Sequence, residues 1–275
     1  MMNTYATHSV CKTLIALFTA LNMFTNSVSF FTGGNDRGSA GDINGTTIVI
    51  TLFVSDVEYG WSVKNNEDIE RIDNVNEYLS IAGDYLEEQV SNYGGEAEFI
   101  TDFITHEDLA YYVRVDRNME NVEFERDYDA NDEVMWSNID EYIDVDYLKE
   151  KYQADNAVFL AVFNTDVNNP AITCTRNWYP GMESDNEIVF LYYIDYGMVN
   201  PPAVYAHEIL HTFSAPDLYT TNPEFGITQG TIIGIQNKYP NDIMLTCSDL
   251  RTGDYVYDRI TNEITEITAS YIGLI

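Results

Sequence analysis

Two of the chain's four histidines stand four residues apart, and an acidic residue directly follows the first: His207-Glu208-Ile209-Leu210-His211. On a helix, residues at i and i+4 lie on one face, one turn apart. Both Nε2 atoms can then bind one zinc ion at about 2.0 Å. Glu208 lies beside that metal, where its carboxylate can act as the general base that takes a proton from a zinc-activated water. The motif therefore predicts zinc-dependent hydrolysis of peptide bonds.

A zinc peptidase needs three protein ligands and an open fourth coordination position. After His211 the chain reads Thr-Phe-Ser-Ala-Pro-Asp-Leu-Tyr. A chain that leaves the helix at Ser214 and doubles back can bring the carboxylate of Asp217 to the same metal. Pro-Asp is also a common turn pair, so a downstream acid such as Glu224 is the alternative third ligand.

The elements that position this motif follow from hydrophobic periodicity and from helix-start signals. Asn200 as N-cap and Pro201 at the first helical position predict a helix over residues 201–213. Strands are expected at 47–54, 97–104, 157–163 and 187–194, and further helices at 68–93 and 264–275. The alternation of strands and helices over the first two thirds of the chain favours an α/β fold over a sandwich.

Residues 106–146 form a long acidic stretch, which we expect to be a solvated insertion ending in a short helix at 145–152. Within it, Asp127-x-Asp129-x-Asn131 resembles the start of a calcium-binding loop. Such a loop needs glycine at its sixth position and glutamate at its twelfth, and this chain has aspartate and asparagine there. The mismatch argues against a calcium loop.

The chain has 275 residues, with 13 Lys and Arg against 45 Asp and Glu and a formal net charge of −32. This length suits one large domain. The charge argues against a nucleic-acid partner or an anionic membrane surface, because phosphate groups are bound by clustered cations. It suits a protein that stays dispersed in solution, with protein or peptide substrates as its partners.

The N-terminus resembles a secretory signal peptide over residues 1–29, since an apolar run at 14–24 follows Lys12 and precedes small residues. That run is too short and too interrupted for a membrane span. Residues 30–46 read as a flexible Gly-rich linker, and residues 47–275 as the catalytic domain. The protein is therefore expected to be secreted, either extracellular or held at the cell surface.

Three cysteines are present. Cys11 would leave with the signal peptide, while Cys174 and Cys247 either pair in an oxidising compartment or stay as buried thiols.

The pattern His207-Glu208-x-x-His211-x-x-Ser214-x-x-Asp217 resembles the extended zinc signature of the metzincin metallopeptidases, in its variant with aspartate as the third ligand. The ending Pro-Asp-Leu-Tyr is similar to that of bacterial immune-inhibitor-A-like secreted peptidases. The resemblance is specific from about residue 203 to residue 244. It implies a metzincin-like zincin domain of the α/β (α+β) class, in which a twisted mixed sheet and an active-site helix precede a smaller C-terminal part.

The resemblance also assigns roles to single residues. It favours Asp217 over Glu224 as the ligand, places Met244 in a methionine turn beneath the zinc site, and gives Tyr219 a hydrogen bond to a ligand or to the transition-state oxyanion. It further implies that the strand at 187–194 forms the upper edge of the cleft, where an extended peptide can add. Ser214 is a departure, because the family has glycine at this turn.

The leading hypothesis is thus a secreted zinc metalloendopeptidase with Glu208 as general base. A catalytically silent, zinc-stabilised extracellular binding protein is the alternative. A third reading is an acid-rich intracellular protein with incidental histidines.

Overall fold

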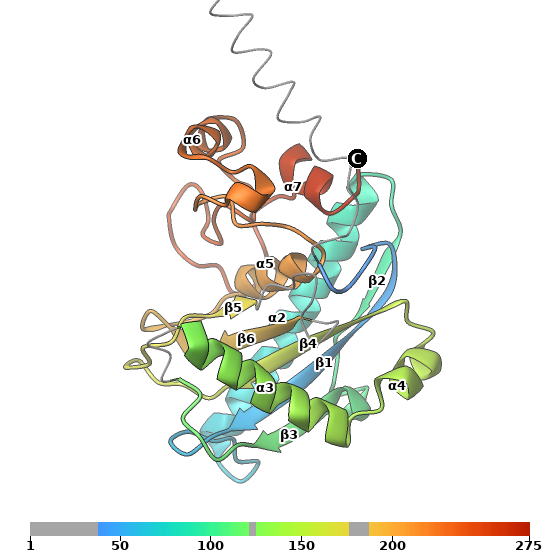
Figure 1. The fold of residues 1–275 in the computed structure, drawn as a ribbon, viewed down its shortest axis with the longest axis vertical. Coiled ribbons are helices and arrows are strands. Elements are labelled where there is room, and N and C mark those ends of the chain that lie inside the picture. Colours follow the sequence, from blue (N-terminus) through green and yellow to red (C-terminus); the bar gives the residue numbers. More distant parts are fainter. Residues whose placement is uncertain (1–37, 121–124, 176–186) are drawn as a thin grey trace, which may run out of the picture. The chain divides into compact units, whose positions relative to one another are not determined.

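The computed structural model describes residues 38–120, 125–175 and 187–275. The expected signal peptide and the first part of the expected linker lie outside the described residues. Six strands form one twisted mixed sheet in the described part of the chain (Figure 1). They are β1 (Gly45–Ser55), β2 (Ala97–Ile100), β3 (Ala110–Arg114), β4 (Asn156–Phe163), β5 (Cys174–Thr175) and β6 (Ile188–Tyr192).

The sheet is built around β1 and β4, whose nearly continuous apolar runs are buried along their length. Strands that are covered on both faces have this composition. Both β2 and β3 pair in parallel with β1 along one edge, β4 pairs in parallel along the other, and β6 follows β4 in parallel. The short strand β5 closes the sheet and is antiparallel to β6.

Helices cover both faces of the sheet (Figure 1). The helices of the described residues are α2 (Asn66–Asn92), α3 (Glu125–Tyr142), α4 (Val145–Tyr152), α5 (Pro202–Thr212), α6 (Gln229–Lys238) and α7 (Glu266–Tyr271), of which α6 and α7 lie beyond α5, away from the sheet. One face carries α3, whose Trp136 ring meets the edge of Phe159 on β4. The opposite face carries α2 and α5, where Phe99 on β2 contacts Phe213 at the end of α5.

A hairpin and two short turns complete the described elements. The hairpin of β7 (Ile194–Asp195) and β8 (Met198–Val199) joins β6 to α5, and 3-10 turns lie at Glu107–Leu109 and Pro223–Phe225. Both central residues of the hairpin have positive φ, 49° at Tyr196 and 76° at Gly197. This conformation matches the twist of two-residue hairpins.

The mixed α/β architecture expected from the sequence is confirmed, and so are the long helix α2 and the helix that carries the histidines. The start of that helix differs by one residue. Pro201 is its N-cap and Pro202 its first residue. Asn200 instead points into the core, where its side-chain amide donates to Thr173 Oγ1 (2.8 Å) and to the Tyr192 carbonyl (2.9 Å).

The expectation that the strand at 187–194 forms the edge of the cleft is wrong. Its counterpart β6 lies between β4 and β5, so β5 is the strand at this end of the sheet. Because β5 has only two residues, it shows no alternation of apolar and polar residues in the sequence. Its position next to β6 is therefore visible only from the strand pairing in the structure.

The acidic stretch is not a solvated insertion. It contains β3, which extends the sheet, and α3, which buries Met135 and Ile139 against it. Residues 125–142 are helical, so the calcium-like spacing lies mostly on a helix rather than in a loop. The many carboxylates on the outer side of α3 hide its apolar stripe from a composition-based reading.

Residues 38–44, which the sequence assigns to a flexible linker, are packed. Ala40 and Ile43 are buried, and the Ala40 amide donates to the Thr212 carbonyl (2.9 Å) at the end of α5. Gly38 approaches the same turn so closely that a Cβ there would lie 2.5 Å from the Ser214 nitrogen. Because it lacks a Cβ, Gly38 permits this close contact between two backbone segments.

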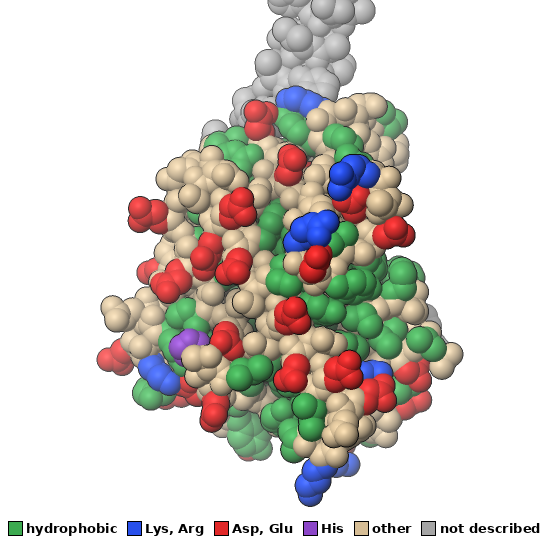
Figure 2. Space-filling view, turned by 180° about the vertical axis from the view of Figure 1, so that it is seen from behind, with side chains coloured by type: hydrophobic (Ala, Val, Ile, Leu, Met, Phe, Trp, Pro, Cys, Tyr) green, Lys and Arg blue, Asp and Glu red, His purple; other side chains and the backbone are tan. Residues whose placement is uncertain are grey.

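Carboxylates are scattered over the face shown in Figure 2, with few lysines and arginines between them. Glu120, which follows β3, is an exception because it is buried. Burial raises its pKa to about 8, with further contributions from the charges of Asp56, Glu58 and Asp166.

Glu120 therefore holds its proton more tightly in the folded protein than in the unfolded chain. Its contribution to stability is complete below the ordinary carboxyl pKa of 4.5 and is lost as the pH rises through about 8. We predict that Glu120→Gln, which stays neutral, gains stability relative to the wild type as the pH rises through this window, by an amount on the order of a few kcal/mol. Urea unfolding across the window measures the difference. Glu88→Gln, an exposed site on α2, is the control, and a parallel pH response of Glu120→Gln and wild type would contradict the assignment.

Candidate metal centre

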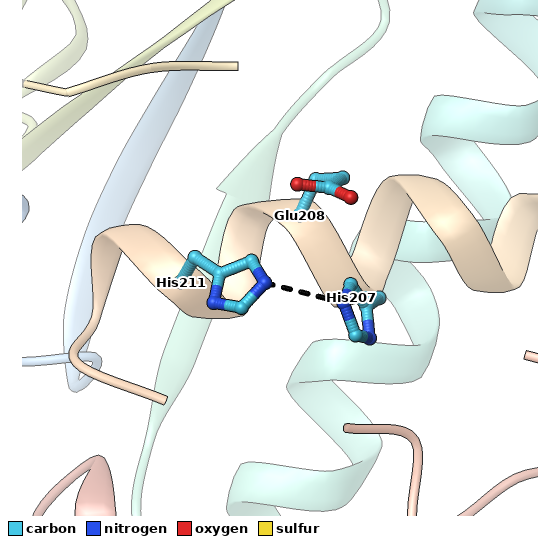
Figure 3. Close-up of side chains that lie close together, drawn as sticks. All are labelled: His207, Glu208 and His211. Atoms are coloured by element: carbon cyan, nitrogen blue, oxygen red, sulfur yellow. Dashed lines mark hydrogen bonds between the residues drawn. The ribbon is translucent and has the colours of Figure 1, made fainter. Parts of the chain in front are cut away.

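The two motif histidines lie one turn apart on α5, with nearly perpendicular rings whose Nε2 atoms point toward each other (Figure 3). The helix is buried from Pro202 to Leu210, which explains its nearly all-apolar sequence. The Nε2 atoms of His207 and His211 are 3.2 Å apart. Glu208 lies beside them, and its carboxylate belongs with the two imidazoles to one group that could hold a metal ion.

Asp217 completes a triangle with the histidines. Its Oδ1 atom lies 3.2 Å from His207 Nε2 and 3.4 Å from His211 Nε2. A tetrahedron with metal–ligand bonds of about 2.0–2.1 Å has edges of about 3.3–3.4 Å. The three atoms are thus spaced as three corners of a tetrahedral site. The alternative ligand Glu224 is exposed in the 3-10 turn at Pro223–Phe225.

The contacts of the Nδ1 atoms determine whether the Nε2 atoms can bind a metal ion. His207 Nδ1 lies 2.9 Å from the Ile243 carbonyl, and His211 Nδ1 lies 2.7 Å from the Ala215 carbonyl. A carbonyl only accepts, so each Nδ1 carries a proton, and Nε2 presents a lone pair whenever the ring is neutral. Three lone-pair atoms converge here, and the buried Asp217 Oδ1 receives no hydrogen bond. Such a donor set fits a metal cation.

The turn that returns Asp217 to the helix is a Schellman motif. The Ser214 amide donates to the His211 carbonyl (2.9 Å), and the Ala215 amide donates to the Leu210 carbonyl (3.1 Å). Ser214 occupies the left-handed position with φ of 78°, where glycine is usual. Its hydroxyl oxygen is buried without a hydrogen-bond partner.

Met244 is fully buried and belongs to the hydrophobic core. Main-chain carbonyls of its turn contact the candidate site: Ile243 accepts from His207, and Met244 accepts from the Leu218 amide (2.9 Å) next to Asp217. Two successive carbonyls therefore hold His207 and the neighbour of Asp217.

The turn at Met244 is fixed by the buried carboxylate of Asp242. This group accepts from the Met244 amide (2.8 Å), the Thr265 hydroxyl (2.5 Å) and the Thr268 hydroxyl (2.7 Å). Thr265 is the N-cap of α7, so Asp242 connects the floor of the site to the C-terminal helix. The sequence analysis did not identify this role of Asp242.

Tyr219 lies at the outer side of the site. Its ring stacks on that of His207 with centroids 6.3 Å apart, and more than half of the residue is exposed. Burial of part of the side chain raises its pKa, and the charge of Asp217 and a hydrogen bond with it add to the effect. The phenol therefore remains a proton donor next to the ligand set.

The electrostatics of the cluster favour an added positive charge. Burial lowers the pKa of His207, but the neighbouring Cys247 sulfur and Asp217 carboxylate raise it more. His211 follows the same pattern, with Asp217 outweighing burial. Burial raises the pKa of Asp217, and the two imidazoles outweigh it and lower that pKa. A proton or a metal ion is thus stabilised between these groups.

Two further side chains lie near the cluster and were not assigned to it from the sequence. Thr175 on β5 lies within hydrogen-bond distance of Glu208, 2.8 Å from both its Oε2 and its carbonyl oxygen. Cys247 approaches the Ala203 carbonyl at 3.7 Å and contacts His207. Among the described residues, Cys174 and Cys247 are not joined by a disulfide.

Comparison with protein-family models, curated proteins and solved structures finds no match for this chain. In the described ranges, none of the helices combines the length and apolarity needed to cross a membrane. The geometry of the cluster therefore carries the functional argument.

We predict that Ser214→Gly stabilises the protein by about 1 kcal/mol, because glycine adopts positive φ without steric cost and the substitution removes a buried, unpartnered hydroxyl. In a chain of this size the melting temperature should rise by about 2–4 °C. Ser214→Ala, which removes the hydroxyl and keeps the Cβ, separates the two contributions. Calorimetry that finds Ser214→Gly less stable than wild type would refute the assignment of strain to this turn.

Proposed function

We propose that this chain is a secreted zinc-dependent endopeptidase of the metzincin type, with protein or peptide substrates. The observation that carries the proposal is the convergence of His207 Nε2, His211 Nε2 and Asp217 Oδ1 at tetrahedral spacing. Two nitrogens and one carboxylate oxygen form a ligand set that zinc takes in catalytic sites, where a fourth position is left open. The apolar run at 14–24 supports export.

His207, His211 and Asp217 would hold the zinc ion. When bound, zinc supplies a Lewis acid that makes water a stronger acid near neutral pH and polarises the carbonyl of the scissile bond. The carbonyl contacts of His207 and His211 keep both rings in the tautomer that offers Nε2. Since such outer contacts orient metal ligands, the turn at Met244 contributes to affinity without touching the ion.

Glu208 is the residue that moves protons. Its carboxylate takes a proton from the attacking water and delivers it to the amine nitrogen of the leaving peptide, so the group returns to its starting state after each bond is cleaved. Only 5% of Glu208 is exposed to solvent, and this burial restricts the motion of its carboxylate. Tyr219 is the candidate donor to the oxygen that becomes negative in the transition state.

The edge strand β5 and the surface charge indicate how substrates approach. An extended peptide can add to the edge of a sheet, and among the described residues β5 is the last strand beyond β6. The net charge of −32 would attract cationic segments over a distance set by ionic strength. This attraction raises the association rate without defining a cleavage specificity.

We predict that Glu208→Gln keeps its zinc and lowers kcat for peptide cleavage by about 10²–10⁴-fold, because the amide cannot accept and return a proton. Zinc content by atomic absorption and cleavage of an unfolded protein measure the two properties. Glu224→Gln, at an exposed acid outside the cluster, is the matched control. Full cleavage by Glu208→Gln would eliminate the mechanism, whereas zinc binding without cleavage by the wild type would favour the zinc-stabilised binding protein.

We further predict that zinc stabilises the fold and that Asp217 is required for most of the effect. At a free zinc concentration one hundred times Kd, binding adds about 2.7 kcal/mol to the unfolding free energy. Thermal unfolding with and without zinc should show this gain in the wild type and in Glu224→Ala, and a much smaller gain in Asp217→Ala. Equal zinc-induced shifts in the two variants would exclude Asp217 as a ligand.

A further inference from the structure

The hydroxyl of Thr175 contacts Glu208 in two places. Thr175 Oγ1 lies 2.8 Å from the Glu208 carboxylate oxygen Oε2 and 2.8 Å from the Glu208 main-chain carbonyl oxygen. Thr175 is 8% exposed and Glu208 is 5% exposed, so water has little access to this contact. The two residues come from different elements, β5 and α5.

A hydroxyl has one proton to donate and two lone pairs to accept with. Thr175 can therefore donate to only one of the two oxygens at a time. Donation to either oxygen keeps the Glu208 side chain beside β5.

Thr175 is itself held in place. It pairs with Val189 on β6, next to the pairing of Cys174 with Phe190. Two residues earlier, the Thr173 amide donates to the buried carboxylate of Asp195 at 2.8 Å. A hydroxyl on a fixed strand gives the Glu208 side chain a defined position, which a solvent molecule could not do.

We infer that Thr175 is a positioning residue for the general base: its hydroxyl holds the Glu208 carboxylate in place. The inference rests on the proposed peptidase function. It requires no substrate contact by Thr175, and it explains why this residue of the edge strand turns its hydroxyl to the helix.

The test uses the full chain loaded with zinc and a series at position 175. Valine has the shape of threonine without the hydroxyl, and serine retains the hydroxyl. We expect Thr175→Val to lower kcat about ten- to a hundredfold, the effect of losing a hydrogen bond to a charged group, with KM changed by less than about twofold, since uniform binding is untouched. Thr175→Ser should recover most of kcat. Zinc content should equal that of the wild type in both variants.

Thr51→Val is the matched control. Thr51 is a fully buried strand threonine whose hydroxyl oxygen has no hydrogen-bond partner. Its replacement makes the same chemical change away from Glu208 and should leave kcat unchanged. A Thr175→Val enzyme as active as Thr51→Val would overturn the inference while leaving the proposed function intact. Loss of activity that serine does not rescue, or that follows loss of zinc, would also overturn it.

A second readout needs no activity. Urea unfolding of the metal-free protein is measured for Thr175→Val, Glu208→Ala and the double variant. If the two side chains interact, the double variant loses less stability than the sum of the single losses. Strict additivity would overturn the inference. Absence of cleavage by zinc-loaded wild type would instead show that the proposed function fails and that this inference fails with it.

Discussion

The candidate site depends on one reversal of the chain. The last turn of α5 points His211 outward, and Asp217 reaches the same point only because the backbone turns left-handed at Ser214. This conformation costs about 1–2 kcal/mol for a residue with a Cβ. The Schellman hydrogen bonds to the His211 and Leu210 carbonyls offset it. Close approach of Gly38 to the Ser214 nitrogen leaves the turn little room to relax.

The arrangement below the histidines shows how main-chain atoms can organise a side-chain cluster. Asp242 fixes a turn, and carbonyls of that turn then hold His207 and the residue after Asp217. Burial raises the pKa of Asp242. Four hydrogen bonds, from two hydroxyls and two amides, offset part of this increase. The carboxylate connects α7 with the ligand set, which links a distant helix to the geometry of the metal centre.

The sequence was informative where the chemistry lies in side-chain type and spacing. The motif on α5 and the buried strands β1 and β4 follow from residue spacing and periodicity. Spacing left Asp217 and Glu224 open as the third ligand, and the resemblance to the metzincin signature favoured Asp217. Contacts through carbonyls, such as that of Ile243, were not predictable because every residue carries a carbonyl. Thr175 was not predictable because β5 is too short to show a pattern. The helix α3 was mistaken for solvated chain, since its carboxylates are as numerous as its apolar residues.

The packed glycine segment has a consequence for how the protein folds. Supports of the metal centre come from Gly38, from Thr175 and from the Asp242–Thr268 contact, which lie far apart along the chain. Contacts at large sequence separation require the closure of long loops, which costs conformational entropy. A polypeptide synthesised only as far as Asp217 would therefore carry the motif without the Asp242–Thr268 contact that supports the ligand triangle.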